Sequence, residues 1–338
     1  MKLLHFLANN QPELALLYKG NVLPVRAAAE AAKLPPLPAT LDAVLEDLEV
    51  HEPTLRIVDS KFRSGDFEEL ALEYHAVKLQ APVLKPNSCR DAYAFRQHVA
   101  TSRANRGKEM IPEFDHFPVF YFTNHRSIFG PGEVPLMVDH FQKLDYELEA
   151  AIVIGKRGRN IACSKAEDYI FGLTLLNDLS SRRLQMEEMK LNLGPAKGKD
   201  FANVLGPVLV TLDELEEYRT EPKEGHTGRG FNLAMKASIN GKLYSEGNLA
   251  SMDWSFEEII ERVSYGVDIF PTDVIGSGTV GTGCLLELNG TRSREEEDYD
   301  PVWLQPNDMV TLEMDAVGKL ESKLIKASDY SLLELKHI

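Results

Sequence analysis

The stretch LDYELEAAIVIG, residues 144–155, places an acid at every second position directly before an uncharged run. In an extended strand, residues two apart point to the same face. We therefore expect Asp145, Glu147 and Glu149 to project together from the start of a buried strand. Carboxylates that share a face repel one another and resist burial, and no lysine or arginine lies among these three.

Two interpretations of this acidic strand are open on spacing alone. Either the face is solvated and marks an edge strand, or a divalent cation bound to the carboxylates relieves the repulsion. Asp178, which ends the apolar run FGLTLLND, favours the cation, although an Asp there is also typical of a helix N-cap. No pair of Cys or His residues offers a competing zinc site. Glu147, Glu149 and Asp178 are thus a candidate hard-metal triad, and Asp145 is expected to be the solvated member of the acidic strand.

The bulk composition excludes several classes of protein. The chain has 338 residues, of which 43% are hydrophobic and 26% charged, enough for one large domain and a smaller one. A net charge of −15 without a basic stripe argues against nucleic-acid binding, and no apolar run is long enough to span a membrane. The three cysteines are widely spaced and odd in number, which predicts no disulfide framework and a reducing, cytoplasmic compartment.

The first part of the chain is expected to form a small β-rich N-terminal domain over residues 1–82. ELALLYKGNVLPV indicates a hairpin with Gly20-Asn21 at its turn, and Thr40 is placed to cap a short helix over LDAVLEDL. The proline-punctuated segment PVLKPNS then marks a boundary, after which residues 83–338 would form the larger domain.

The larger domain is expected to be mainly β. SCRDAYAFRQHVATSR indicates a helix over 88–103, residues 117–155 are strand-rich, and a short helix is expected around 164–169. The Asn-Gly pairs in ASINGKLYSEG and LELNGTRS both predict hairpins. Between them a helix over SFEEIIERVSYG has a capping box, Ser255 with Glu258, and ends at Gly266, while VTLEMDAVGKLESKLI predicts a last hairpin. Many strands without regular β-α alternation favour an α+β fold over a doubly wound or barrel α/β fold.

Two glycine-rich segments resemble nucleotide-binding loops. GSGTVG, residues 276–281, matches a dinucleotide fingerprint, but such a site needs a helix to start there, and CLLELNG is expected to be strand and hairpin. GPAKGKD, residues 194–200, is one residue short of a phosphate-binding loop, and Asp200 replaces the hydroxyl residue that would bind magnesium. Neither segment therefore predicts a nucleotide site.

Four segments in order resemble the fumarylacetoacetate hydrolase family: YELEAAIVIGK, DYIFGLTLLNDLSSRRLQ, GPAKGKDFANVLGPVLVT and GSGTVGTGCLLEL. The resemblance covers about residues 85–325 and implies a mixed β-sandwich or β-roll catalytic domain. It also implies a divalent cation held by Glu147, Glu149 and Asp178. Mg²⁺ is the leading expectation, with Ca²⁺ and Mn²⁺ open, because all three accept oxygen ligands.

The segment DAYAFRQH contains a further acid and a histidine, Asp91 and His98, seven residues apart. On a helix this spacing puts both on one side. Spacing alone leaves two other interpretations open: Asp91 as the capping-box partner of Ser88, and His98 as an exposed helical histidine. The segment is similar to one in the family, and the resemblance implies that Asp91 is a fourth metal ligand, Tyr93 a substrate contact and His98 the general base.

The resemblance also implies roles for residues farther along the chain. These residues are Tyr121 as a second substrate contact, Glu287 as the carboxylate that orients the base, Arg182, Gln185 and Lys199 as donors to an oxyanion, Thr279 as a contact to the substrate carboxylate, and Arg106, or else Arg103, as a further substrate contact. The sequence departs from the family pattern where Met189 stands near an expected tyrosine and Asn203 replaces a threonine. Both departures surround the substrate and leave the metal ligands intact.

The expected activity is metal-dependent hydrolysis of a C–C bond in a 1,3-diketo acid. Fumarylacetoacetate, cleaved to fumarate and acetoacetate in tyrosine breakdown, is the leading substrate that the resemblance implies. Acylpyruvate hydrolase, oxaloacetate decarboxylase and 2-oxo-acid hydratase are the alternatives within the family, and a non-catalytic ligand-binding protein on the same fold is another. The resemblance implies a homodimer whose partner is a small-molecule diketo acid, with no nucleic acid and no membrane.

Overall fold

The computed structural model describes residues 1–334, and its largest element is a mixed sheet of 12 strands. The central path of this sheet runs β4 (Leu72–Glu73), β3 (Asn21–Pro24), β2 (Gln11–Tyr18), β1 (Lys2–Ala8), β15 (Asn203–Thr211), β13 (Ile170–Asp178), β11 (Leu148–Ile154), β21 (Val274–Gly276), β6 (Cys89–Ala92) and β7 (Phe120–Thr123). Beside this path, β5 (Leu79–Gln80) pairs with β1 and β8 (Ile128–Phe129) pairs with β15.

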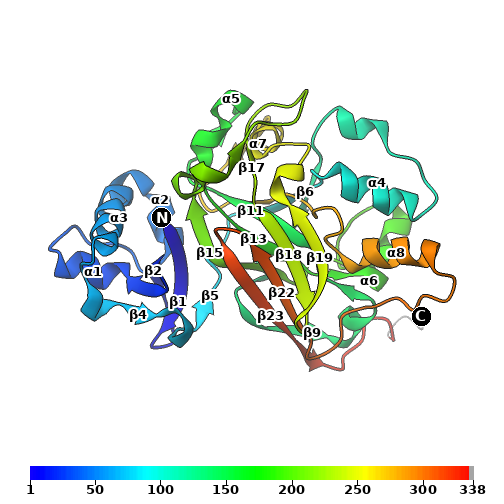
Figure 1. Ribbon diagram of the computed structural model, residues 1–338, viewed down its shortest axis with the longest axis horizontal. Helices are drawn as coiled ribbons and strands as arrows, with labels where there is room; N and C mark the ends of the chain where they lie inside the picture. The colour runs from blue at the N-terminus through cyan, green and yellow to red at the C-terminus, as the bar shows by residue number, and fades with distance from the viewer. Residues whose placement is uncertain (335–338) are drawn as a thin grey trace.

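A second sheet of five strands packs against the first (Figure 1). Its order is β19 (Lys242–Asn248), β18 (Ala234–Ile239), β22 (Met309–Met314), β23 (Gly318–Ser328) and β9 (Gly132–Met137). Three short pairs complete the strands: β10 (Leu144–Asp145) with β14 (Ser180–Ser181), β12 (Gly158–Arg159) with β20 (Asp268–Ile269), and β16 (Arg219–Thr220) with β17 (Gly230–Phe231). Two sheets with helices at their ends and on the outer face confirm the α+β fold class.

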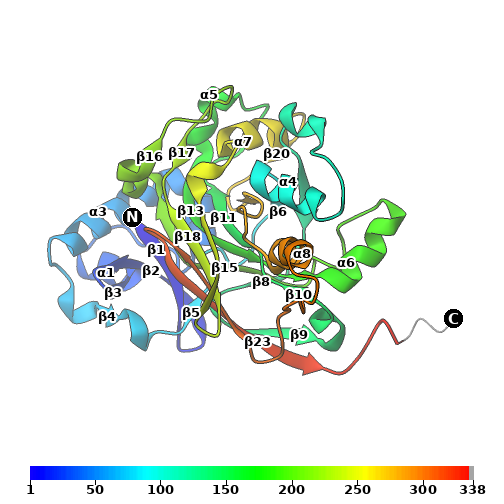
Figure 2. The ribbon, with the colours of Figure 1, turned by 45° about the vertical axis from the view of Figure 1, so that its right-hand side comes forward.

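The helices lie in three groups. They are α1 (Val25–Ala31), α2 (Leu41–Glu46) and α3 (Leu48–Arg63) near the N-terminal strands, α5 (Cys163–Ala166) and α7 (Phe256–Ser264) at one end, and α4 (Arg96–Ala104), α6 (Arg182–Glu188) and α8 (Leu285–Glu295) around the site described below. Figures 1 and 2 show α8 between α4 and α6 on the side of the molecule away from α1–α3. In the described part of the chain, no helix is both long and apolar enough to cross a membrane.

Strand β11 lies in the middle of the large sheet, between β13 and β21, and is buried on both faces. Ala150 and Ile152 belong to the core between the two sheets, whereas Ala151 and Val153 belong to the core beneath the N-terminal helices. The edge-strand interpretation of the acidic stretch is therefore wrong. A continuous uncharged run is what a strand with two buried faces requires.

Several local predictions are confirmed. Thr40 accepts a hydrogen bond from the Ala43 N–H at the start of α2, and Ser255 and Glu258 form the capping box of α7. The hairpins β18–β19 and β22–β23 are present. The first hairpin, β2–β3, also forms, but Tyr18 pairs with Asn21, so its turn is Lys19-Gly20 and not Gly20-Asn21. The helix predicted around 164–169 is a short α5 followed by a 3₁₀ turn.

The helix predicted over 88–103 is wrong in its first half. Cys89–Ala92 is strand β6, which runs parallel to β21, and the helix begins only at Arg96. Pairing with the sheet overrides the local helical pattern. Asp91 and His98 therefore come from a strand and a helix, and Asp91 is not a capping partner of Ser88, whose hydroxyl donates to Asp273.

The hairpin predicted at LELNGTRS is also wrong, because this segment is helix α8. The Asn289 side chain bonds the backbone of Val302, and a Cβ at Gly290 would lie 2.5 Å from the Asn105 side chain of the segment following α4. The Asn-Gly pair thus serves close packing and not a turn. A helix does follow the GSGTVG segment, contrary to expectation, but its first N–H groups bind a protein carboxylate and are not free for a pyrophosphate.

The N-terminal strands continue the large sheet, since β1 pairs with β15 through Lys2 and Leu3. Residues of both parts share the core beneath α1–α3, including Leu14, Val153 and Leu209. The division of the chain at residues 82 and 83 stays a prediction.

Candidate metal centre and active site

Four carboxylates converge at one end of the central strands. They come from Asp91 on β6, Glu147 just before β11, Glu149 on β11 and Asp178 at the end of β13, and each offers an oxygen within 4.8 Å of the others. All four side chains are buried. Gly276 on β21 leaves the room they need, because a Cβ there would lie 2.4 Å from Asp91 Oδ1. Sheet pairing thus brings together acids that are far apart in the sequence.

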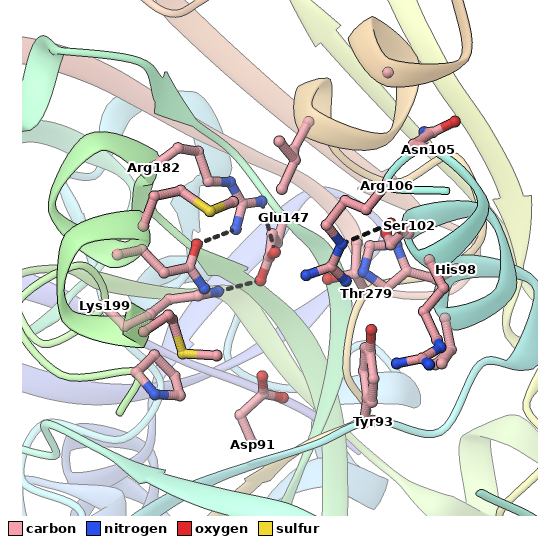
Figure 3. A pocket seen from close by; sticks show the side chains of 18 of the residues that line it. Asp91, Tyr93, His98, Ser102, Asn105, Arg106, Glu147, Arg182, Lys199 and Thr279 are labelled. Carbon is pink, nitrogen blue, oxygen red and sulfur yellow. Dashed lines mark hydrogen bonds and ion pairs between the residues drawn. The ribbon is translucent and has the colours of Figure 1, made fainter. Parts of the chain in front are cut away.

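Two cations meet one side of this cluster. Lys199 Nζ donates to Glu147 and, at 2.6 Å, to Asp178 Oδ2, while Arg182 Nη2 donates to Glu147 Oε1 at 2.7 Å (Figure 3). Burial opposes ionisation of Glu147, but Lys199 and Arg182 outweigh it and lower the pKa of Glu147 to about 2. Glu147 is therefore held as a carboxylate.

The other side of the cluster carries more negative charge than its surroundings offset. Burial and the charge of Asp178 raise the pKa of Asp91 to about 7. Burial, together with Asp91 and Glu147, raises the pKa of Glu149 well above its usual value. Among the described residues, Glu149 Oε2 and Asp178 Oδ1 have no hydrogen-bond partner.

These observations fit a hard divalent cation. Buried oxygens without partners are costly, and a group of oxygen donors with excess negative charge is what Mg²⁺, Ca²⁺ and Mn²⁺ prefer. Asp91, Glu147, Glu149 and Asp178 are the residues that would hold it. That assignment carries forward the prediction of four metal ligands.

A histidine and a glutamate form a pair beside the cluster. His98, on α4, and Glu287, in the first turn of α8, are both buried, and His98 Nδ1 lies 2.7 Å from Glu287 Oε2. The carboxylate fixes the imidazole tautomer and leaves Nε2 to exchange a proton. The ring of Tyr93 contacts His98 edge to face, with ring centroids 5.8 Å apart. The structure thus brings together the residues predicted as base and orienting acid.

Asp145 is not the solvated residue that the sequence suggested, because its side chain is fully buried. It accepts hydrogen bonds from the N–H groups of Leu285 (2.7 Å) and Leu286 (2.9 Å) and from Arg182 Nε (2.8 Å). The N-cap residue of α8, Cys284, makes no side-chain cap of its own. Asp145 therefore caps α8 from another element, a role whose only sequence signal was its place in the acidic alternation.

Asp91 and Glu147 of the cluster and His98 of the pair line a cavity of about 740 Å³, whereas Glu149, Asp178 and Glu287 are not among its lining residues. Of the predicted residues, it is lined by Asp91, Tyr93, His98, Arg103, Arg106, Tyr121, Glu147, Arg182, Gln185, Lys199 and Thr279. In Figure 3, Arg106 lies between Glu147 and His98, with Tyr93 below them, and both arginines that could contact substrate line the same cavity.

The remaining predicted residues are tied to this framework by hydrogen bonds. The Tyr121 hydroxyl donates to Asp178 Oδ2 at 2.5 Å, and the Thr279 hydroxyl donates to Glu149 Oε1 at 3.1 Å. Gln185 Oε1 accepts from Arg182 Nη1 at 2.9 Å. Tyr121 and Thr279 therefore contact metal-ligand candidates as well as the cavity.

Sequence reasoning missed some residues of the cavity. Met186, Leu286, Asn289, Pro301 and Trp303 line it, although no motif singled them out. Of the two departures from the family pattern, Met189 lines the cavity, whereas Asn203 is buried and donates to Thr123 Oγ1 at 3.3 Å.

The fold and the site define a class: an α+β protein with a buried carboxylate centre suited to a divalent cation, next to a histidine–glutamate pair. The family of the fumarylacetoacetate (FAA) hydrolase C-terminal domain matches residues 88–325, and the chain belongs to this family. Solved structures with this fold include hydrolases and an isomerase, and one of these hydrolases is in complex with manganese(II).

Three relatives cover most of the chain. An uncharacterized protein of Staphylococcus epidermidis is 30% identical over 293 residues, which is 86% of both chains. The structure resembles a fumarylacetoacetate hydrolase from psychrophilic Exiguobacterium antarcticum, with a TM-score of 0.68, 24% identity and coverage of 96% and 99% of the two chains. It also resembles maleylpyruvate hydrolase from Sphingobium sp. SYK-6 in complex with manganese(II) and pyruvate, with a TM-score of 0.67, 19% identity and coverage of 97% and 100%.

Proposed function

We propose that the protein is a metal-dependent hydrolase that cleaves a C–C bond in a 1,3-diketo acid. The observation that carries the proposal is the His98–Glu287 pair beside four buried carboxylates, with His98, Asp91 and Glu147 lining one cavity. A divalent cation held by Asp91, Glu147, Glu149 and Asp178 would supply a Lewis acid that polarises the two oxygens of an enolised diketone.

The chain's own residues supply the proton transfers. His98 takes a proton from water through Nε2, and Glu287 stabilises the imidazolium that forms. Hydroxide adds to the carbonyl, and the electron pair of the adjacent C–C bond then passes to the neighbouring carbon. The products are a carboxylic acid, which loses its proton to solvent and becomes a carboxylate, and an enolate, whose carbon takes the proton held by His98.

Lys199, Arg182 and Gln185 are the donors proposed for the oxyanion formed by this addition. Buried donors that are already fixed in place stabilise such a charge without rearranging. Arg182 is held by Asp145, Glu147 and Gln185, and Lys199 by Glu147 and Asp178. Arg106, Tyr93, Tyr121 and Thr279 line the same cavity and are proposed to contact the substrate.

Fumarylacetoacetate is the first substrate to test, with Mg²⁺ as the first cation. Acylpyruvates are the second candidates, because Met189 lines the cavity where the family resemblance leads one to expect a tyrosine, which makes the wall less polar. The resemblance to a maleylpyruvate hydrolase that binds manganese(II) supports testing Mn²⁺ beside Mg²⁺. A cytoplasmic homodimer remains part of the proposal.

The decisive experiment assays both substrate types with Mg²⁺, with Mn²⁺ and with chelator, using the native protein and His98→Ala. We expect turnover only with metal, and a fall in kcat of about 10²- to 10⁴-fold in His98→Ala while cation affinity measured by calorimetry is retained. Full turnover by His98→Ala would remove the proposed base. No turnover of any diketo acid with metal present would favour a ligand-binding protein.

A further inference from the structure

The outer part of the cavity is apolar and exposed. Ile111, Val119, Met186 and Met189 all line it, and their relative exposures are 37%, 48%, 40% and 43%. They come from separate segments: the loop after α4, the residues before β7, helix α6, and the turn that follows it, Met189–Leu191. Large apolar side chains that remain exposed inside one concave site mark a surface that a ligand covers.

Further uncharged residues line the cavity. Leu286, Pro301 and Trp303 line it, together with Asn289 and Ser293. Among the residues that line the cavity, the only acids are Asp91 and Glu147, and both belong to the carboxylate cluster. Apolar, amide and hydroxyl side chains therefore make up most of the lining of the cavity.

Four cationic side chains also line the cavity: Arg103, Arg106, Arg182 and Lys199. Lys199 and Arg182 are engaged by carboxylates of the centre. Arg106 forms no ion pair within residues 1–334, and its Nε donates to the Ser102 carbonyl at 2.9 Å. Arg103, in the last turn of α4, likewise donates to a backbone carbonyl, that of Glu109. Within residues 1–334, the two cationic lining side chains without an ion pair thus lie on α4 and just beyond it, whereas Met186 of α6 and the 301–303 segment contribute apolar side chains.

The cavity is large for a small dicarboxylic acid. Its volume of about 740 Å³ lies in the upper half of the roughly 300–1,000 Å³ typical of sites for drug-sized ligands. A short oxo acid bound at the carboxylate cluster would leave the four exposed apolar side chains in contact with water.

We propose that the ligand of this cavity is a 2-oxo acid whose end remote from the carboxylate is an extended apolar group, either an alkyl chain or an aryl ring. This inference rests on the proposed function, since it places the oxo-acid end at the carboxylate cluster. The apolar end lies in the lobe formed by Ile111, Val119, Met186 and Met189. Unbranched methionine side chains adapt to chains of different shape, so the lobe accepts a series of lengths.

Binding tests the lobe without relying on turnover. Saturated 2-oxo acids contain no scissile C–C bond between two carbonyls, so pyruvate, 2-oxobutanoate, 2-oxohexanoate and 2-oxooctanoate are titrated into the Mg²⁺-loaded protein by calorimetry. We expect the dissociation constant to fall about threefold with each added methylene, as burial of apolar surface requires. A dissociation constant that stays level or rises with chain length would overturn the proposal.

Paired variants locate the effect. Met186→Gln and Met189→Gln, combined, keep the side-chain length but make the lobe polar, and they should reduce the ratio of the pyruvate and 2-oxooctanoate dissociation constants at least tenfold. Leu243→Gln is the matched control, because Leu243 is 48% exposed on β19 and lies outside the cavity lining. An equal loss in the control, or none in the methionine variant, would place the apolar group elsewhere.

Turnover distinguishes failure of this inference from failure of the proposed function. In a series from acetylpyruvate to hexanoylpyruvate, kcat/KM should rise with chain length, and benzoylpyruvate should exceed acetylpyruvate. If acetylpyruvate is cleaved but kcat/KM does not rise with chain length, the apolar lobe is contradicted and the hydrolase activity is supported. If binding of the 2-oxo acids strengthens with chain length but no acylpyruvate is cleaved, the lobe is supported and the hydrolase activity is contradicted.

Discussion

Glu147 and Glu149 stand two residues apart at the start of the same strand, yet the structure treats their charges in opposite ways. Glu147 contacts Lys199 and Arg182, and they lower its pKa to about 2 against the effect of burial. Glu149 contacts no lysine or arginine in the described part of the chain, and burial with Asp91 and Glu147 raises its pKa well above its usual value.

The difference shows that a shared strand face does not imply a shared electrostatic environment. The pleat aims both side chains the same way, but the ionic partners of Glu147 arrive from helix α6 and from the segment before β15. The ion pairs of Glu147 with Lys199 and Arg182 therefore stabilise the fold, and the same residues also have proposed catalytic roles. The Glu149 side is where an added cation offsets the most unbalanced charge.

The largest expected effect comes from neutralising the two glutamates separately. In chelator, Glu147→Gln should lower the free energy of unfolding by about 3 kcal/mol, because Lys199 and Arg182 each lose a buried partner. Glu149→Gln should change it by less than about 0.5 kcal/mol, since Glu149 has no lysine or arginine partner among the described residues to leave unpaired and glutamine has nearly the same shape. Urea unfolding of both variants measures the difference.

Added metal sharpens the same comparison. Mg²⁺ should raise the melting temperature of the native protein by binding only the folded state, and it should raise that of either variant much less. Equal destabilisation of the two variants in chelator would contradict the division of the centre into two differently balanced halves.

Asp145 links the Glu147 side of the centre to the His98–Glu287 pair. It binds Arg182 and the first two N–H groups of α8, the helix that carries Glu287. Asp145→Asn should cost about 2 kcal/mol of stability, because asparagine cannot offset the Arg182 charge or accept all three bonds. It should also lower kcat by about 10²-fold with little change in KM, since a small displacement of Glu287 misplaces His98.

Asp139 offers a matched control for that experiment. It is a buried carboxylate that accepts from the Ser331 hydroxyl and from the N–H groups of Leu332 and Leu333, and within residues 1–334 its side chain forms no hydrogen bond or ion pair with α8 or Arg182. Asp139→Asn should therefore lower stability and leave kcat unaltered at a temperature where the variant is folded. A parallel loss of kcat in both variants would show that Asp145 acts only through overall stability.

The sequence predicted the members of this site better than their surroundings. Regular alternation identified Glu147 and Glu149 as neighbours, because a strand's two-residue period is a local property. It could not show that Lys199 and Arg182 would balance only one of them, since that depends on contacts across 52 and 35 residues. The acidic stretch contains no lysine or arginine, but in the folded protein two such residues from other segments contact Glu147.

The same limit explains the errors in secondary structure. The segment around Asp91 has a helical pattern, but pairing with β21 makes it a strand and places Asp91 beside the other acids. The Asn-Gly pair at 289–290 favours a turn locally, yet contacts with Val302 and Asn105 hold it in α8. Elements with local signals of their own, such as the Ser255–Glu258 capping box, were predicted correctly because their contacts lie within one helix.

The smallest effect tests the same electrostatic rule outside the centre, at His140. Its ring stacks on Phe201 with centroids 4.0 Å apart, and its Nδ1 accepts from the Met137 N–H at 3.2 Å. Burial and the nearby Lys197 lower the pKa of His140 to about 4, although Asp200 and Asp139 act in the opposite direction. The folded protein therefore holds this ring neutral where an unfolded chain would protonate it.

Because the folded pKa lies below the unfolded value near 6.5, the contribution of His140 is present above that value and is lost as the pH falls toward 4. Part of the ring reaches solvent, so we expect only about 1 kcal/mol of extra acid sensitivity. His140→Phe retains an aromatic ring against Phe201 and cannot titrate, so its free energy of unfolding should fall less than that of the native protein between pH 7 and pH 4.5. If the free energy of unfolding falls equally with pH in the two proteins, then burial without an ionic partner does not shift the pKa of His140 as it shifts that of Glu149.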